Sequence, residues 1–254
     1  LSINWEIWEE SYSSISNNNL CPPYPSCIEN FVGDQDTSEC EEPYLCDEEI
    51  EVELWGECYN IEETTELVLE ESGLVGEIPS EIGDLINLTE LILLNNQLTG
   101  EIPSEIGNLI NLEYLELEGN QLTGEIPQSI GNLTELIRLN FLFNQLTGEI
   151  PSEIGNLTNL TELGLCYNQL TGEIPSEIGE MTDLFLLCLN TNQLIGEIPS
   201  EIGNLISLEY LDLGDNHLDG EIPVEFGNLT NLTYLNLGLD LHTDEGGNQL
   251  SGEI

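Results

Sequence analysis

The sequence has almost no basic residues. One Lys or Arg stands against 50 Asp and Glu, and the formal net charge of the 254 residues is −49. Nucleic acid and anionic lipid surfaces are excluded as partners because both require clustered basic side chains. A chain with this charge repels itself unless cations screen it. Adaptation to a salty medium explains the charge, and so does binding of calcium or other divalent cations as counter-ions. The composition favours the first explanation, and the two are compatible.

Long apolar runs are also missing. No stretch approaches the roughly 18–20 apolar residues that a membrane span needs, so no membrane insertion is expected. No basic segment followed by an apolar run opens the chain, so no signal peptide is visible. The first residue is Leu1 rather than Met. We therefore expect either a processed chain or a piece of a longer one.

Side chains for catalysis and metal binding are scarce. The sequence contains two His, and no Ser, Cys or Asp stands beside a plausible base. No C-x-x-C pair occurs, and both His are far from the Cys-rich segment, which argues against zinc. We expect no enzyme activity, no catalytic residue, no metal site and no cofactor.

What the sequence does contain is a repeat. The motif G-E-I recurs at steps of 24 residues, and a further copy follows 32 residues later. Its copies begin at Gly76, Gly100, Gly124, Gly148, Gly172, Gly196, Gly220 and Gly252. Within one unit, Leu163 and Leu165 alternate with other residues as in a short strand with one buried face. The stretch SEIGNL suits a single helical or 3-10 turn. Such a unit buries its leucines only when copies stack, with the strands pairing in parallel.

An Asn recurs at one place in the repeat. Its copies are Asn96, Asn120, Asn144, Asn168, Asn192 and Asn216, and Ser72 takes this place in the first repeat. A buried Asn offers both a carbonyl and an amide, so it can bond backbone groups of its own turn and of the next one. We therefore expect these side chains to satisfy the backbone where each strand turns away.

The pattern L-x-x-L-x-L-x-x-N-x-L-x-G-x-I-P over residues 61–254 resembles the plant-specific class of leucine-rich repeats, which also occurs in bacterial and algal surface proteins. The resemblance implies an α/β solenoid with a parallel sheet on the concave face and short helical or 3-10 turns on the convex side. It also implies recognition of peptides, glycans or proteins on the concave face, without catalysis.

Three segments are expected along the chain. Residues 1–32 form a divergent terminal repeat, because SSISNNNLCPPYPSCI places an Ile, an Asn, a Leu and a Pro at repeat positions; coincidence in a short window is the alternative. Residues 33–60 form an acidic, Cys-rich linker with an N-terminal cap. Residues 61–254 form the array of about eight repeats, which needs a cap because its first core edge would otherwise be bare.

The seven Cys divide between the two ends of the problem. Five crowd into the first quarter, namely Cys21, Cys27, Cys40, Cys46 and Cys58, which indicates disulfides and an oxidising compartment. Trp55-Gly56-Glu57-Cys58 with Cys46 upstream resembles the family's N-terminal cap, although a residue is missing and Val is replaced. Cys21 and Cys27 resemble its C-terminal cap. The favoured pairs are Cys46 with Cys58 and Cys21 with Cys27, which leaves Cys40 over.

The other two, Cys166 and Cys188, lie in neighbouring repeats but are displaced by two residues along the strand. Combining about 4.8 Å sideways with about 6.6 Å along the strand separates their Cα atoms by roughly 8 Å. Disulfides rarely tolerate more than about 7 Å, so these two are predicted to be unbonded to each other.

Aromatic side chains and one cation mark the concave face. The candidate binding residues are Tyr114, Arg138, Phe143, Tyr167, Tyr210 and Tyr234. Aromatics mixed with acids on an exposed sheet favour a binding surface, and an ordinary solvated face is an equal alternative. For Arg138 an ion pair with Glu162 is favoured over ligand recognition, with stacking on Tyr114 as an addition.

Six N-x-[ST] sequons are candidate glycosylation sites: Asn87, Asn132, Asn156, Asn159, Asn228 and Asn231. Glu77, Glu101, Glu125, Glu149, Glu173, Glu197 and Glu221 recur outside the concave face, and stacking is expected to line them into a ladder at roughly 5 Å steps.

Two functions remain. The first is an extracellular or cell-surface structural protein that assembles with copies of itself, head to tail, into a fibre. Its contact would join the alternating start of one copy to the last strand of the next, because exposed strand edges recruit other strands. The residues of this contact are Leu1, Ile3, Trp5, Trp8, Leu235, Leu237 and Ile254. The alternative is a ligand-binding or adhesion ectodomain that recognises protein, peptide or glycan on its concave face.

Overall fold

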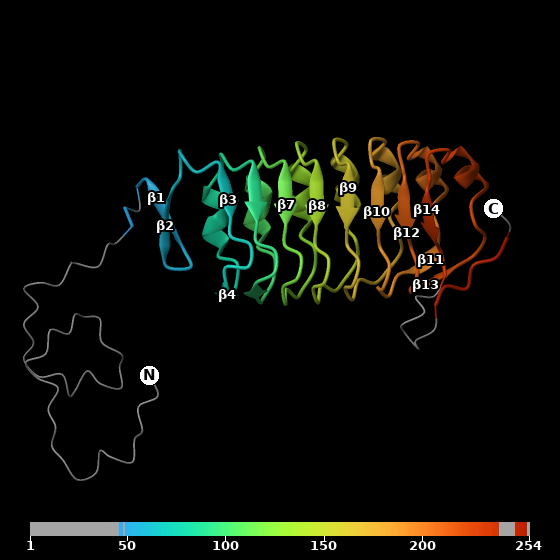
Figure 1. The fold of residues 1–254 in the computed structure, drawn as a ribbon, viewed down its shortest axis with the longest axis horizontal. Coiled ribbons are helices and arrows are strands. Elements are labelled where there is room, and N and C mark those ends of the chain that lie inside the picture. Colours follow the sequence, from blue (N-terminus) through green and yellow to red (C-terminus); the bar gives the residue numbers. More distant parts are fainter. Residues whose placement is uncertain (1–45, 48, 239–246, 253–254) are drawn as a thin grey trace, which may run out of the picture. The chain divides into compact units, whose positions relative to one another are not determined.

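The computed structural model describes residues 46–47, 49–238 and 247–252, and these residues form a stack of repeats (Figure 1). One face of the stack is an eight-stranded parallel sheet in the order β14-β12-β10-β9-β8-β7-β5-β3. Its strands are β3 (Glu66–Val68), β5 (Glu90–Ile92), β7 (Tyr114–Glu116), β8 (Arg138–Asn140), β9 (Glu162–Gly164), β10 (Leu186–Cys188), β12 (Tyr210–Asp212) and β14 (Tyr234–Asn236).

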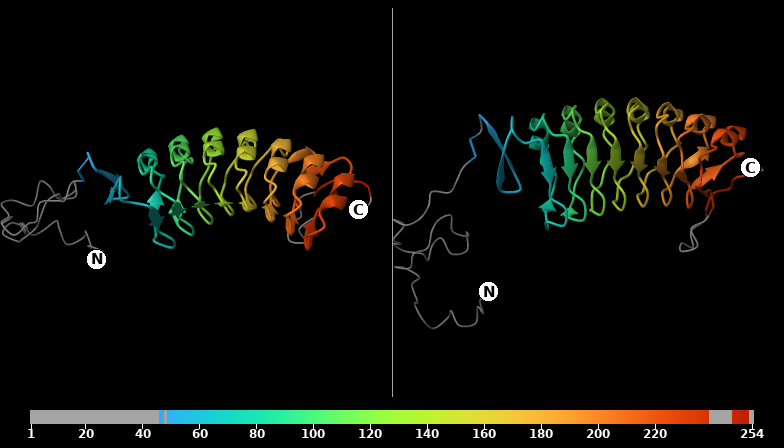
Figure 2. Two further views of the ribbon diagram at one scale, coloured as in Figure 1. Left: turned by 90° about the horizontal axis from the view of Figure 1, so that it is seen from above. Right: turned by 45° about the horizontal axis from the view of Figure 1, so that its top comes forward.

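The opposite face carries one 3-10 helix per repeat, as Figure 2 shows from above. These are η2 (Ser80–Asp84), η3 (Ser104–Asn108), η4 (Gln128–Asn132), η5 (Ser152–Asn156), η6 (Ser176–Glu180), η7 (Ser200–Asn204) and η8 (Val224–Asn228). Each begins after a Pro in the extended conformation, and its Ile or Phe is buried. Within the described residues these short turns are the whole helical part of the fold, which confirms the expected solenoid.

Two small parallel sheets complete the turns of the solenoid. They pair β4 (Val75–Gly76) with β6 (Gln97–Leu98), and β11 (Ile195–Glu197) with β13 (His217–Asp219). Between them, isolated bridges join Glu101 to Thr123 and Glu125 to Thr147, so the Glu rows are stacked in register.

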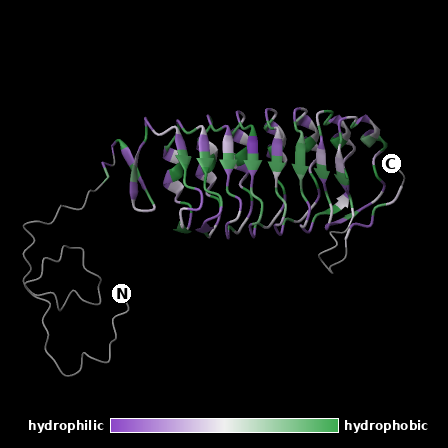
Figure 3. Ribbon diagram, viewed as in Figure 1, coloured by the Kyte–Doolittle hydropathy of each residue, from purple (hydrophilic) through white to green (hydrophobic). Residues whose placement is uncertain are grey.

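The strands are short because only their middle residue needs burial. Leu163 in β9 is fully buried, while its neighbours face outward, and the hydropathy colouring in Figure 3 follows this alternation. Leu165 and Ile154 close the core from the strand end and from the 3-10 turn, and both are fully buried. Close stacking also needs glycine: a Cβ on Gly155 would lie 2.5 Å from the Glu177 carbonyl oxygen of the next repeat.

The recurrent Asn side chains bond as expected. Asn168 is 8% exposed; its amide donates to the Phe141 carbonyl of the preceding repeat at 2.9 Å, and its oxygen accepts from Leu146 N at 3.0 Å. Asn248 continues this row after the eight-residue insertion, donating to Leu213 and Leu237. The prediction for Ser72 is wrong: it is exposed and donates to the Glu70 carbonyl of its own turn, because a hydroxyl on a short side chain cannot bridge two repeats.

An antiparallel hairpin caps the first repeat. It pairs β1 (Glu51–Leu54) with β2 (Glu57–Asn60) through a two-residue turn at Trp55 and Gly56, both with positive φ, which is the geometry of a tight hairpin turn. The indole of Trp55 donates to the Glu77 carbonyl at 3.1 Å, and Leu54 is fully buried. A Cys46–Cys58 disulfide with Cα atoms 5.5 Å apart closes the cap, which is the pairing favoured above.

Part of the sequence-based expectations lies outside the described residues. This applies to Cys21, Cys27, Cys40, Leu1, Ile3, Trp5, Trp8 and Ile254, and to the proposed terminal repeat at residues 1–32. Of the residues expected to assemble copies, Leu235 and Leu237 are described, and both pack half-buried against the protein's own core.

Candidate binding surface

The sheet face consists of the first and third residues of each strand, whose side chains point away from the core. The first residues form a row in register: Glu66, Glu90, Tyr114, Arg138, Glu162, Leu186, Tyr210 and Tyr234. The third residues form a second row: Val68, Ile92, Glu116, Asn140, Gly164, Cys188, Asp212 and Asn236. Parallel pairing brings corresponding side chains of adjacent repeats about 4.8 Å apart, so each row is a continuous surface.

Arg138 is held between two carboxylates. It donates to Glu162 at 2.5 Å, as expected, and to Glu116 at 3.2 Å, which the sequence analysis did not anticipate. These two bonds oppose desolvation, and the pKa of Arg138 is raised above its ordinary value, chiefly by the hydrogen bond to Glu162. Next to it, Asn140 donates to Glu118 at 2.7 Å. This cluster carries a net negative charge although it contains the chain's one basic side chain.

Tyr210 and Tyr234 stack at the other end of the same row. Their ring centroids are 4.3 Å apart and their planes differ by 3°. Both hydroxyls donate to Asp212, and Asn236 and Gly214 N donate to the same carboxylate. Burial outweighs these bonds and raises the pKa of Asp212, while burial and the nearby carboxylate raise the pKa of Tyr210.

Phe143 and Tyr167 form a second stacked pair beyond the ends of β8 and β9. Their centroids are 4.4 Å apart, and their exposed fractions are 50% and 36%. Both residues have φ above +50°, a left-handed conformation that costs roughly 1–2 kcal/mol for a residue with a side chain. Exposed aromatics held in a costly backbone conformation are typical of a functional surface.

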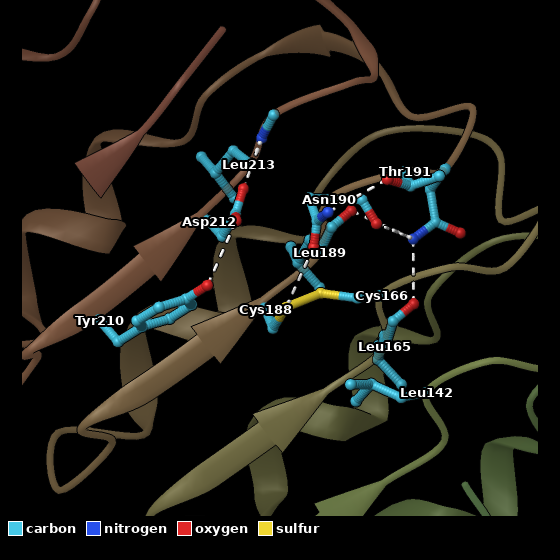
Figure 4. The surroundings of a disulfide bond; sticks show 12 residues. Leu142, Leu165, Cys166, Cys188, Leu189, Asn190, Thr191, Tyr210, Asp212 and Leu213 are labelled. Atoms are coloured by element: carbon cyan, nitrogen blue, oxygen red, sulfur yellow. Dashed lines mark hydrogen bonds between the residues drawn. A yellow bond between two sulfur atoms is a disulfide. The ribbon is translucent and has the colours of Figure 1, made fainter. Parts of the chain in front are cut away.

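The two cysteines of the repeats are bonded, so the prediction that they are free is wrong. The Cα atoms of Cys166 and Cys188 lie 5.5 Å apart (Figure 4). The predicted 8 Å assumed that the chain stays extended through Cys166. However, β9 ends at Gly164, and the chain then bends toward Tyr167, which has positive φ. The offset along the strand is therefore shorter than two extended residues.

The bonded cysteines lie beside a hollow in the sheet face that the sequence analysis did not anticipate. Its volume is about 230 Å³, and its lining is Arg138, Leu139, Asn140, Leu142, Glu162, Gly164, Leu186, Cys188 and Tyr210. The hollow exists because Gly164 brings no side chain to a row where its neighbours carry Asn140 and Cys188. A lone Gly inside a strand was the available signal, since it marks a close approach or a missing surface.

The structure brings five of the six candidate residues into two stacked pairs and one ion cluster. Tyr114 lies between Glu90 and Arg138 in the first row, half-buried. The sequons lie away from the sheet, at the ends of the 3-10 turns or just after them; Asn87, Asn159 and Asn231 each donate to a carbonyl of the preceding repeat. Within the described part of the chain, no group of His, Cys, Asp and Glu has an arrangement suited to a metal ion.

Comparison with known families decides the classification. A model of a leucine-rich repeat region matches residues 67–194, and a second leucine-rich-repeat model matches residues 207–229. The chain belongs to the leucine-rich-repeat family. No functionally curated protein matches it significantly in sequence. The described residues of this leucine-rich-repeat chain include no helix with the length and apolar character of a membrane span.

Similar solved structures come from plants. The ectodomain of the membrane receptor kinase GASSHO1/SCHENGEN3 from Arabidopsis thaliana, in complex with CASPARIAN STRIP INTEGRITY FACTOR 2, is 41% identical with a TM-score of 0.67, covering 73% of this chain and 21% of that one. The plant peptide hormone receptor RGFR1 in complex with RGF2 is 35% identical with a TM-score of 0.68, covering 74% and 29%. This chain thus spans between a fifth and a third of those receptors.

A plant ice-binding protein is also similar. It is 29% identical with a TM-score of 0.51, and the match covers 75% of this chain and 73% of that one. The similarity therefore extends over most of both leucine-rich-repeat chains.

Proposed function

We propose that this leucine-rich-repeat chain is a non-enzymatic, extracellular binding module that holds a peptide or protein segment on its sheet face. The observation that carries the proposal is the gathering of exposed aromatics into two stacked pairs on that face, Phe143 with Tyr167 and Tyr210 with Tyr234. Rigid aromatic side chains supply large contact area at low entropic cost, and they are enriched where binding energy concentrates.

Two further observations support this proposal. The receptors for CASPARIAN STRIP INTEGRITY FACTOR 2 and for RGF2 resemble this chain at 41% and 35% identity. The disulfides Cys46–Cys58 and Cys166–Cys188 support an oxidising compartment. Head-to-tail assembly into a fibre has no such support, because Leu235 and Leu237 pack on their own core among the described residues.

Selection of random peptides on the purified full chain tests the proposal. We expect enriched peptides to protect β8 to β14 from hydrogen exchange and to lose affinity for a Tyr210→Ala/Tyr234→Ala variant. A matched control is Ile110→Ala, which alters an exposed apolar side chain on the opposite face. Enrichment of no peptide, or protection confined to the 3-10 turns, would overturn the proposed function.

Ice binding is a second candidate, favoured by one row on the other side of the solenoid. The residue two after each 3-10 turn is exposed and uncharged in every repeat: Ile86, Ile110, Thr134, Thr158, Thr182, Ile206 and Thr230. Each is fixed by the same bond from its backbone N to a carbonyl two residues earlier, as Thr182 N to Glu180 O at 3.0 Å. A regular row suits a regular lattice, and a similar protein is ice-binding.

Inhibition of ice recrystallisation is the measurement for this second candidate. Thr182→Lys, which touches no sequon, should abolish it, whereas Thr123→Lys outside the row should not. An unmodified chain without effect on ice growth would remove the candidate.

A further inference from the structure

The hollow at Gly164, called here the Gly164 hollow, has the size of one side chain. Its volume of about 230 Å³ is below the roughly 300–1,000 Å³ of sites that enclose whole small molecules. A site of this size on an open sheet accepts one anchoring side chain of a longer partner, in the way that binding hot spots fill well-defined pockets.

The floor and walls of the hollow are apolar. Leu142 and Leu186 are half-buried on two sides, and the Cys166–Cys188 disulfide lies below, with Cys188 9% exposed. Figure 4 shows Leu142 and Tyr210 to either side of this disulfide. The disulfide ties β9 to β10 directly beside the hollow, so its shape is fixed before any partner arrives. A preformed apolar recess favours an apolar guest, because polar guests would lose hydrogen bonds with water.

The rim of the hollow is negative. Arg138 is matched by Glu116 and Glu162, so these three side chains sum to one negative charge, and Glu118 lies beside them on Asn140. The whole chain carries −49. A partner with acidic groups would be repelled at long range and at the rim, whereas a basic partner is attracted and steered.

We infer that the Gly164 hollow seats one large apolar side chain of a cationic peptide segment, with Lys or Arg flanking that anchor. This inference rests on the proposed peptide-binding function and names the partner's chemistry. The anchor is enclosed by Leu142, Leu186 and the disulfide, and the flanking cations meet Glu116 and Glu162. Tyr210 closes one side of the hollow, so the stacked tyrosines continue the same binding track.

Gly164→Val is the decisive variant. A Cβ on Gly164 would lie 2.2 Å from Leu142 Cδ1 and 3.1 Å from Asn140 Oδ1, so added methyl groups push the flexible end of Leu142 into the hollow. Gly164 has no positive φ, so Val suits its strand position. Ile92→Val is the matched control, because it places the same residue in the same row three repeats away. Leu186→Gln is a second variant that makes one wall polar without changing charge.

The experiment selects random decapeptides on the full chain at physiological salt and then measures the affinity of the most enriched synthetic peptide. We expect Lys or Arg within two positions of a Phe, Tyr, Leu or Met. Replacing that anchor by Ala should weaken binding about tenfold or more, as should Gly164→Val and Leu186→Gln, while Ile92→Val should not.

The possible results separate this inference from the proposed function. Peptides that bind the sheet face but are acidic, or that bind Gly164→Val and Leu186→Gln like the unmodified chain, overturn the hollow and leave the peptide-binding function standing. Recovery of no peptide, or binding only on the 3-10 side, overturns both.

Discussion

Arg138 in β8 donates to Glu162 in β9 at 2.5 Å, across neighbouring strands of the sheet face. Because Arg138 also donates to Glu116 in β7, one guanidinium joins three consecutive repeats. No other side chain in this sequence has a permanent positive charge. The sheet face is therefore more cohesive electrostatically at β7 to β9 than elsewhere.

Replacing Arg138 by Gln should lower the free energy of unfolding by about 1–2 kcal/mol, because two partly buried carboxylates lose their charged donor. Urea unfolding at low and moderate salt measures this, and the loss should shrink as salt screens Glu116 and Glu162. Arg138→Lys should recover part of the loss, since an ammonium supplies charge without a two-pronged donor. Equal stability of all three proteins would contradict a structural role for the ion cluster.

Periodicity predicted the stacked repeats because each unit repeats the same burial pattern: Leu163, Ile154 and Asn168 occupy positions that recur every 24 residues. The same reasoning placed Arg138 beside Glu162, since register in a parallel sheet follows from the repeat length. It could not predict the Cys166–Cys188 bond or the Gly164 hollow. Both depend on where one strand ends and on a missing side chain, which are local departures from the repeat.

Salt should stabilise this chain. Glu101 and Glu125 belong to a row of exposed carboxylates stacked at roughly 5 Å steps, and each like-charged pair costs about 1 kcal/mol before screening. We expect the melting temperature to rise between 20 mM and 500 mM NaCl, and to rise with calcium at lower concentrations. An uncharged osmolyte of matched osmolality serves as control. A melting temperature that ignores both salts would show that the rows do not limit stability.

The Cys166–Cys188 disulfide should be detectable and stabilising. Digestion without reduction should yield one peptide pair linked through these two residues. The bond closes a loop with a sequence separation of 22 residues, so a Cys166→Ala/Cys188→Ala variant should lose about 3 kcal/mol of unfolding free energy. Reductant should destabilise this variant less than the unmodified chain, because only Cys46–Cys58 would remain of the two described disulfides. Recovery of both cysteines as free thiols would contradict the bond.

Burial of Asp212 should make the stability of the chain depend on pH. Because burial raises the pKa of this carboxyl in the folded state, the folded chain holds its proton to higher pH than the unfolded chain does. Its contribution is therefore most favourable below the unfolded pKa of about 4 and is lost as pH rises through the raised folded pKa. At neutral pH the full desolvation cost is present. Asp212→Asn should then be more stable than the unmodified chain at pH 7.5. Its oxygen can still accept from Asn236 and Gly214 N, and its amide can donate to the two tyrosine hydroxyls. The difference should narrow as pH falls toward 4, measured by urea unfolding, with Asp219→Asn on exposed β13 as the control. A variant less stable than the unmodified chain at pH 7.5 would mean that the four hydrogen bonds to the carboxylate outweigh its burial.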